Sequence, residues 1–406
     1  MVTGAGGGAV EPPAIPSASE EPGEAGSARR AVTLAVLLGM TYMYPAYLAG
    51  TLGVAIRLDL GLDSAALGLT ISLFYAVSAV AMSFGGRIAD RMGPRRALRL
   101  AAAMTGASLV GVAVFGGSWA GLLVSLAVGG VGSAVGGPIG ALLIVRNVGL
   151  ARRPMAFGVE RASLPASTLL ASLALPLLAT IMHWRLVFLV GTVAVVVLMT
   201  LRVPDASPPA RAGGVPEPRV PLTPLRPLLM ITGAFFLCSA AANALSGFFV
   251  DYGVTVGLSQ SAAGTALAAG SAVIIAVRLG LGLGRRRRHG RLTVAALMAV
   301  GACGFLLLAS GDRMLGLLGM LIAGGAGWGW TGVIALVIAE AYPAGPGAAS
   351  GLMQAGGSAG GIVGPLAVGA AAQYSSYSLG WALAALFVAL ASVLVLLNRA
   401  AWKEIR

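Results

Sequence analysis

The chain has 406 residues, of which 57% are hydrophobic and only 10% are charged. Because soluble globular proteins carry about 25% charged residues, this composition excludes an ordinary soluble domain and predicts an all-α protein embedded in a lipid bilayer. The net charge of +13 does not indicate a nucleic-acid partner, because the basic residues fall in alternate loops between apolar runs, as the positive-inside rule requires.

The chain begins with a polar segment and continues with twelve apolar runs. Residues 1–29 are rich in Gly, Pro, Ser and Glu, and we expect them to form a disordered cytoplasmic tail. A membrane-spanning helix needs roughly 20 apolar residues, and the runs that follow are of about this length. We expect twelve spanning helices, at residues 31–54, 64–85, 97–117, 119–145, 155–180, 186–202, 227–250, 261–283, 292–309, 314–338, 349–371 and 379–398.

The runs divide into two groups of six, at residues 30–202 and 227–398. Between them, residues 203–226 hold many prolines and several charges, so we expect a solvated cytoplasmic linker. Residues 399–406 form a second short tail. In this order all but a few Lys and Arg residues lie on one side of the membrane. We therefore expect both termini in the cytoplasm and the chain in the cytoplasmic membrane.

Three tyrosines surround Pro45 in the middle of the first run, and two of them, Tyr44 and Tyr47, are candidate substrate-binding residues. A tyrosine hydroxyl at this depth needs a partner, because lipid offers none. We expect these side chains either to face an interior polar cavity or to form hydrogen bonds with a neighbouring helix.

A densely charged turn lies between the second and third runs. It reads G-x-x-x-D-R-x-G-x-R-R, with fixed positions at Gly86, Asp90, Arg91, Gly93, Arg95 and Arg96. The glycines suit close helix packing and a positive backbone φ, and the arginines stay in water at the cytoplasmic face. This spacing resembles the signature of the loop between helices 2 and 3 in the major facilitator superfamily of secondary transporters. The resemblance implies two six-helix bundles that rock about a central site, with the turn in a gating role.

An internal repeat supports two related halves. At a shift of 195 residues, 121–140 matches 316–335 at nine of twenty positions, and at a shift of 196, 61–68 resembles 257–264. Halves related by an axis along the membrane normal are typical of this superfamily. The second copy of the charged turn, at 282–291, is a run of arginines without Asp. We expect it either to contact anionic lipid headgroups or to determine topology alone.

Arg278 is the one basic residue that lies well inside a predicted span. An intramembrane charge costs several kcal/mol unless it is paired or solvated, and by default it marks a functional site. Its position four residues before Gly282 resembles an arginine in helix 8 of oxalate, monocarboxylate and nitrate porters. That resemblance implies that Arg278 binds a substrate anion through its guanidinium fork. The alternative is a side chain that extends to the cytoplasmic interface.

No Asp or Glu lies near the middle of a predicted span, which leaves few carboxylates for proton coupling. Glu160, near the start of the fifth run, is the best candidate, although an ion pair with Arg153 or Arg161 is the favoured role. The superfamily resemblance implies that helices 1, 4, 7 and 10 line the cavity, which adds Asn243 and Trp330 as candidate substrate contacts. Packing is the alternative for each.

These observations predict a monomeric secondary transporter of small solutes, with an organic anion as the leading substrate class and protons as the candidate coupling ion. A drug or natural-product efflux pump that works by proton antiport is the first alternative, and a non-transporting sensor or scaffold is the second. Cys238 and Cys303 lie in separate runs and are expected to be small hydrophobic residues. We expect no cofactor, no metal and no enzymatic activity.

Overall fold

The computed structural model describes residues 22–149, 152–179, 181–204, 223–283, 290–342 and 346–399. These residues are almost entirely helical, without a β-strand among them, so the predicted all-α fold is confirmed. The elements are α1 (Pro22–Thr51), α2 (Gly53–Leu60), α3 (Ser64–Phe115), α4 (Trp119–Asn147), α5 (Arg153–Arg161), α6 (Ser163–Ala174), the π-helix η2 (Leu175–Ala179), α7 (Trp184–Thr200), α8 (Leu225–Thr255), α9 (Gln260–Leu283), α10 (Arg291–Ala309), α11 (Arg313–Gly329), α12 (Thr331–Ala341), α13 (Pro346–Tyr374) and α14 (Tyr377–Leu397). Most of the predicted linker, and the arginine run before residue 290, lie outside the described residues.

Ten helical segments of the described chain are long and apolar enough to cross a membrane, and α7 is a shorter apolar helix of 17 residues. The predicted fifth spanning helix is instead divided into α5, α6 and η2. Pro165 and Pro176 lie in this run, and each removes a backbone donor, which interrupts a regular helix. With α7 and this divided helix, the structure is consistent with twelve crossings.

Three helix boundaries differ from the expectation. α1 begins at Pro22, so part of the segment predicted as a disordered tail, residues 1–29, is helical. The charged turn predicted after the second span is reduced to one non-helical residue, Gly93, inside α3. The predicted tenth helix divides at Trp330 into α11 and α12.

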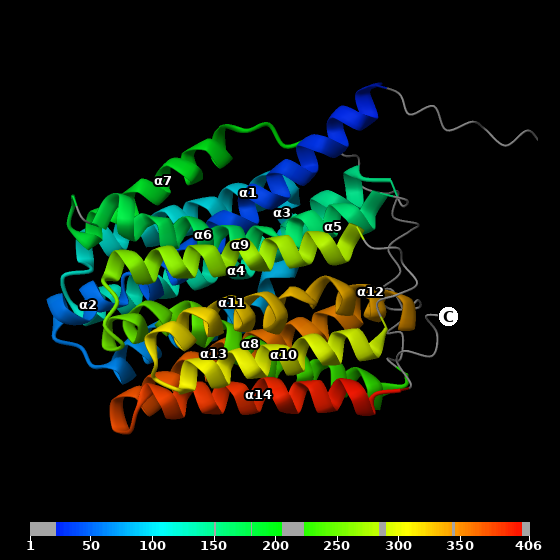
Figure 1. Ribbon diagram of the computed structural model, residues 1–406. Helices are drawn as coiled ribbons and strands as arrows, with labels where there is room; N and C mark the ends of the chain where they lie inside the picture. Colours follow the sequence, from blue (N-terminus) through cyan, green and yellow to red (C-terminus); the bar gives the residue numbers. More distant parts are fainter. Residues whose placement is uncertain are drawn as a thin grey trace, which may run out of the picture.

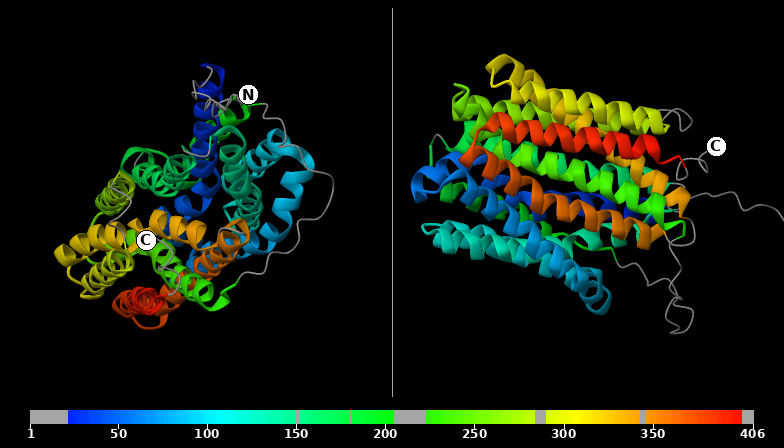
Figure 2. Two further views of the ribbon diagram at one scale, coloured as in Figure 1. Left: turned by 90° about the vertical axis from the view of Figure 1, so that its right-hand side faces the viewer. Right: turned by 90° about the horizontal axis from the view of Figure 1, so that it is seen from below.

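The helices form two groups that pack against each other. We call α1–α7 the N-half and α8–α14 the C-half; they meet where α1 packs on α8, α3 on α13 and α6 on α9 (Figure 1). The start of α1 and the end of α14 lie at the same end of the bundle (Figure 2). We call this the terminal end, and the opposite end, where α2 lies, the distal end.

The two halves repeat one turn at the distal end. Gly61 and Gly257 have positive φ angles of 63° and 86°, which glycine adopts without steric cost. Two residues later, Asp63 Oδ1 and Ser259 Oγ each accept a hydrogen bond from the N–H three residues on, at 2.7 and 3.1 Å. Each side chain therefore caps the helix that follows it. The 196-residue shift found in the sequence is reproduced in the backbone.

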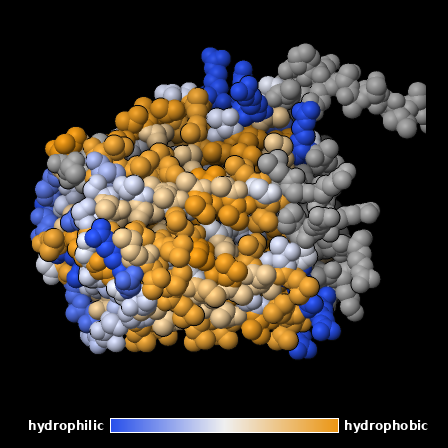
Figure 3. All heavy atoms as spheres, in the orientation of Figure 1, coloured by the Kyte–Doolittle hydropathy of each residue, from blue (hydrophilic) through white to orange (hydrophobic). Residues whose placement is uncertain are grey.

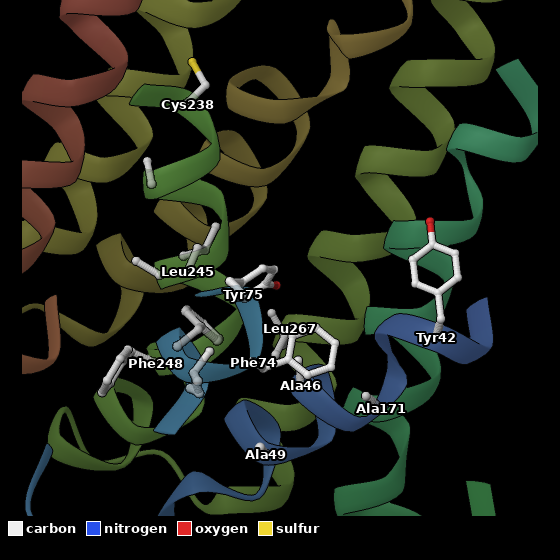
Figure 4. Packing of buried hydrophobic residues seen from close by; sticks show 14 of the residues in the cluster. Tyr42, Ala46, Ala49, Phe74, Tyr75, Ala171, Cys238, Leu245, Phe248 and Leu267 are labelled. Carbon is white, nitrogen blue, oxygen red and sulfur yellow. The ribbon is translucent and has the colours of Figure 1, made fainter. Parts of the chain in front are cut away.

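The surface and the core fit a protein that lies in a bilayer. Apolar residues cover the middle of the bundle, and hydrophilic residues gather at its two ends (Figure 3). Inside, side chains from both halves form one buried cluster. Figure 4 shows Phe74 and Tyr75 of the N-half together with Leu245 and Phe248 of the C-half. The interface between the halves is thus part of the core.

Candidate functional site

Arg278, the predicted anion ligand, lies half-buried on α9 at the interface between the halves. Its Nη1 donates to the carbonyl oxygen of Arg161 at 2.5 Å, and its Nη2 donates to that of Trp328 at 3.3 Å. Its Nε is buried and has no hydrogen-bond partner among the described residues. Since a guanidinium has five N–H donors and the two carbonyls use one each, Arg278 keeps donors for a further acceptor.

Arg161 and Glu160 bring two more charges to this place from the end of α5. Glu160 is buried, and its carboxylate lies 3.6 Å from Arg161 Nε, so the expected ion pair forms with Arg161. Arg161 Nη1 also donates to Gln354 Oε1 of α13 at 3.3 Å, across the interface. Arg278 lies close enough to interact electrostatically with both Arg161 and Glu160. The cluster therefore contains two positive charges and one negative charge.

Tyr42 of α1 stands beside these charges. Its ring lies against Gly136 of α4, because a Cβ placed on that glycine would come within 2.8 Å of it. Its side chain lies near Glu160 and Arg161. Figure 4 shows the Tyr42 ring apart from the packed residues around Tyr75. Tyr42 can therefore offer one hydroxyl donor and acceptor to a group bound beside the arginines.

A row of polar side chains continues from this cluster across the interface. The Tyr47 side chain lies near Arg278 and Tyr75. Tyr75 of α3 donates to Asn243 Oδ1 of α8 at 2.5 Å, and Asn243 Nδ2 donates to the Ser239 carbonyl at 2.8 Å. The predicted candidates Tyr47, Asn243 and Arg278 are thus brought together, with Tyr75 as the link between halves.

Two predicted contacts are placed elsewhere. The Tyr44 ring faces α7, where a Cβ on Gly191 would lie 2.7 Å from it, so Tyr44 packs inside the N-half. Trp330 is fully buried, and its indole N–H donates to the Gly327 carbonyl at 2.7 Å, so it offers no free donor. The half-buried Trp328, whose ring lies 5.9 Å from that of Trp330, is the tryptophan nearer to Arg278.

The charged signature turn is described in part. Gly93 has φ 75° and ψ 161°, so the predicted positive φ is confirmed. Arg95 and Arg96 are exposed at the terminal end, as expected of cationic loop residues. The structure describes only the backbone of Gly86, Asp90 and Arg91, not their side chains or surroundings. The gating role of the turn stays a prediction.

A second polar contact between the halves lies at the distal end, and the sequence did not indicate it. Asp251 of α8 accepts hydrogen bonds from Arg57 of α2 at 2.5 Å and from the Tyr377 hydroxyl of α14. Ser64 N–H of α3 donates to Gln373 Oε1 of α13 at 3.3 Å. The backbones of the two halves also come close together at the distal end. The halves are therefore closed against each other at the distal end.

Asp59, at the same end, serves the N-half alone. Its carboxylate accepts from the Trp184 indole N–H at 3.1 Å and from Arg185 Nη2 at 3.2 Å. The hydrogen bond from Trp184 and the guanidinium of Arg185 lower the pKa of Asp59. This carboxylate fixes α2 to α7, and its contacts with described residues all lie within the N-half.

The sequence contains weak signals for two residues that the prediction missed. Tyr42 precedes the chosen tyrosines in the same span, but spacing alone does not show which of the three faces the interface. Tyr75 lies mid-span in the predicted second helix, where a hydroxyl needs a partner. In both cases a polar aromatic residue at mid-membrane depth was the available signal.

Comparisons with known proteins agree with this architecture. Solved structures with a similar fold include a D-xylose-proton symporter (16% identity, 93% of this chain and 98% of that chain, TM-score 0.72) and the xylose transporter XylE from E. coli in an inward open conformation (13%, 92% and 95%, 0.73). A bacterial homolog of the human lysosomal transporter Spinster, inward-facing and occupied, is also similar (16%, 96% and 99%, 0.69). At these identities the likeness shows the fold alone.

Sequence comparisons reach the family. An uncharacterized MFS-type transporter of Pseudomonas aeruginosa, found in three strains, is 36% identical over 115 residues, and the match covers 25% of this chain and 28% of the relative. The chain thus matches less than a third of the length of these relatives. The family model described as Major Facilitator Superfamily matches residues 32–365. The chain is therefore a multi-pass membrane protein that belongs to the Major Facilitator Superfamily.

Proposed function

We propose that this transporter moves a small organic anion across the cytoplasmic membrane by alternating access. The observation that supports this most strongly is the charge at the interface. Two guanidinium groups, of Arg161 and Arg278, face one carboxylate, of Glu160. A net positive charge in a low-dielectric region is costly unless a negative charge approaches it. A substrate carboxylate supplies that charge.

The donors around Arg278 suit a carboxylate. A carboxylate accepts two parallel N–H bonds from a guanidinium, a strong and directional pairing. Arg278 retains donors after its bonds to two carbonyls, and the Tyr42 hydroxyl lies in the same charge cluster. We expect Arg278 to bind the anion and Tyr42 to contact its oxygen atoms. Tyr47 would lie beside Arg278, and Asn243 would act through the hydrogen bond from Tyr75 that crosses the interface.

The closed distal end supports the alternating-access part of the proposal. If the termini are cytoplasmic, as the basic loops predict, the distal end is extracellular and the described conformation is closed to the outside. Reorientation would then break the contacts of Asp251 and close the terminal end. The signature turn, with Asp90 at its centre, would hold that end shut in the outward-facing state.

Glu160 is the candidate for proton coupling. Its carboxylate is buried and its described ion pair is with Arg161. Protonation of Glu160 would free Arg161 and raise the positive charge of the cluster by one unit. The cluster could then attract a second negative charge, so proton binding would favour anion binding and would support symport.

Transport by the purified protein in liposomes tests the proposal. Radiolabelled monocarboxylates and a cationic dye are assayed with the wild type, Arg278→Ala and the control Arg313→Ala, an exposed arginine at the distal end. We expect wild-type anion uptake, a loss of about tenfold or more in Arg278→Ala, since a charge-assisted hydrogen bond contributes about 1.5–3 kcal/mol, and little change in the control. Dye transport driven by a proton gradient, with anions ignored and Arg278→Ala fully active, would support the efflux alternative instead.

A further inference from the structure

The partner of Arg278 in the N-half is a backbone carbonyl that lacks the usual helical donor four residues later. In an α-helix the carbonyl of residue i accepts a hydrogen bond from the N–H of residue i+4. The residue four positions after Arg161 is Pro165, which has no N–H. The helix is also interrupted here, because α5 ends at Arg161 and α6 begins at Ser163. The Arg161 carbonyl is therefore left for another donor.

Arg278 supplies that donor from the other half of the molecule. Its Nη1 lies 2.5 Å from the Arg161 oxygen. Its Nη2 lies 3.3 Å from the oxygen of Trp328, in the last turn of α11 before the helix divides at Trp330. Two helix interruptions, one in each half, thus present carbonyls to the same guanidinium. Bonds on two nitrogens fix the plane of the group and restrict its rotation.

We propose that Pro165 is a positioning residue for substrate binding, because it keeps the Arg161 carbonyl free to hold the Arg278 guanidinium. This inference rests on the proposed function of Arg278 as the anion ligand. A guanidinium that is already oriented loses less side-chain entropy when it binds a carboxylate than a mobile one. Pro165 touches no substrate itself, and its effect passes through Arg161 and Arg278.

The substitution Pro165→Ala tests the inference, because alanine restores the N–H that can bond the Arg161 carbonyl within the helix. That N–H then competes with Arg278 Nη1 for the Arg161 carbonyl, which weakens the bond from Arg278. We expect KM for the transported anion to rise about fivefold, the fold-change for one hydrogen bond of about 1 kcal/mol, while the maximal rate changes little. Pro138→Ala in α4 is the control for removing a proline from inside a helix, and we expect its KM to match the wild type.

A double-mutant cycle separates a positioning role from a general structural one. Lysine at position 278 keeps the charge but lacks the planar fork, so Pro165→Ala should raise KM no further in an Arg278→Lys background. An equal rise in KM in both backgrounds would overturn the inference, since Pro165 would then act independently of Arg278.

A second readout does not depend on the substrate. The melting temperature of the purified protein in detergent is measured for the same four proteins of the cycle. The change caused by Pro165→Ala should be more positive in the Arg278→Lys background, where the guanidinium that bonds the Arg161 carbonyl is absent. Strictly additive changes would overturn the inference. If the wild type transports no carboxylate, the proposed function fails, and the melting cycle alone still decides whether Pro165 acts through Arg278.

Discussion

Arg57 and Asp251 form an ion pair that joins the N-half to the C-half at the distal end. Arg57 Nη1 lies 2.5 Å from Asp251 Oδ2, and the Asp251 side chain is only 6% exposed. The hydroxyl of Tyr377 donates to the same oxygen. Removing one partner of a buried ion pair leaves the other charge uncompensated, which is strongly destabilising. The pair therefore stabilises the closed distal end.

The first prediction concerns this ion pair. Asp251→Asn keeps the shape of the side chain and removes its charge, so the distal end should open more often. Ser72 is a suitable reporter, since it is buried and its hydroxyl donates to the Ile362 carbonyl of the C-half at 2.7 Å. In a protein with Ser72→Cys and no other cysteine, we expect maleimide labelling at least about tenfold faster, given the 3–5 kcal/mol cost of breaking a buried pair.

Asp59→Asn is the matched control for that measurement. Asp59 also has an arginine partner at the distal end, but its hydrogen bonds come from Trp184 and Arg185, which belong to the N-half. We expect the labelling rate of Ser72→Cys to be unchanged by it. Equal rates for Asp251→Asn and Asp59→Asn would show that the ion pair does not hold the halves together.

The second prediction concerns the hydrogen bond between Tyr75 and Asn243. Tyr75→Phe removes the hydroxyl and leaves Asn243 Oδ1 without this donor, which costs about 1–3 kcal/mol for a buried acceptor. We expect a lower melting temperature and slower transport. Tyr44→Phe removes a hydroxyl from a ring that packs inside the N-half, and it should change transport much less. The prediction is wrong if the two variants transport at the same rate.

The third prediction concerns close helix packing around Gly364 of α13. A Cβ at this position would lie 2.0 Å from the carbonyl oxygen of Ala240 in α8, and backbone atoms cannot yield as a flexible side chain can. Gly364→Ala should destabilise the protein by about 1–3 kcal/mol, as overpacking does. Gly351→Ala lies in the same helix and meets no atom within 4 Å, so its melting temperature should be no lower than that of the wild type, since alanine favours a helix over glycine. Similar melting temperatures for both variants would contradict the described packing.

The fourth prediction concerns the backbone at Gly93 in the signature turn. Its φ of 75° and ψ of 161° lie in a region that is essentially restricted to glycine and costs other residues about 1–3 kcal/mol. No neighbouring atom would contact a Cβ there, so the cost of Gly93→Ala is conformational. We expect a lower melting temperature than for Gly332→Ala, which also meets no atom within 4 Å and has no positive φ. A Gly93→Ala protein as stable as the wild type would be incompatible with this backbone.

The sequence predicts the spans and the repeat well, because apolar runs, Gly61 with Asp63, and Gly257 with Ser259 are local features. It does not predict which side of a helix faces the other half. Tyr44 was predicted as a substrate contact because of its depth in the membrane, yet its ring faces α7. The direction of the ring depends on tertiary packing.

The fifth span shows a second limit of the same kind. Pro165 is visible in the sequence as a missing donor, but the identity of the replacement donor, Arg278, depends on a contact between residues 117 positions apart. The Arg57–Asp251 pair, which joins residues 194 positions apart, has no local signal at all.

In the proposed mechanism, the two halves move against each other around the interface that holds Arg278. Spin labels on exposed residues report this directly: Leu58 and Thr255 for the distal end, and Met155 and Leu292 for the terminal end, each pair joining the N-half to the C-half. The two interlabel distances are measured in proteins without Cys238 and Cys303, before and after addition of the transported anion and with Asp251→Asn. We predict opposite changes in the two distances: in any condition that shortens the terminal distance, the distal distance lengthens. Distances that stay fixed in every condition, or that change together in the same direction, would contradict the account.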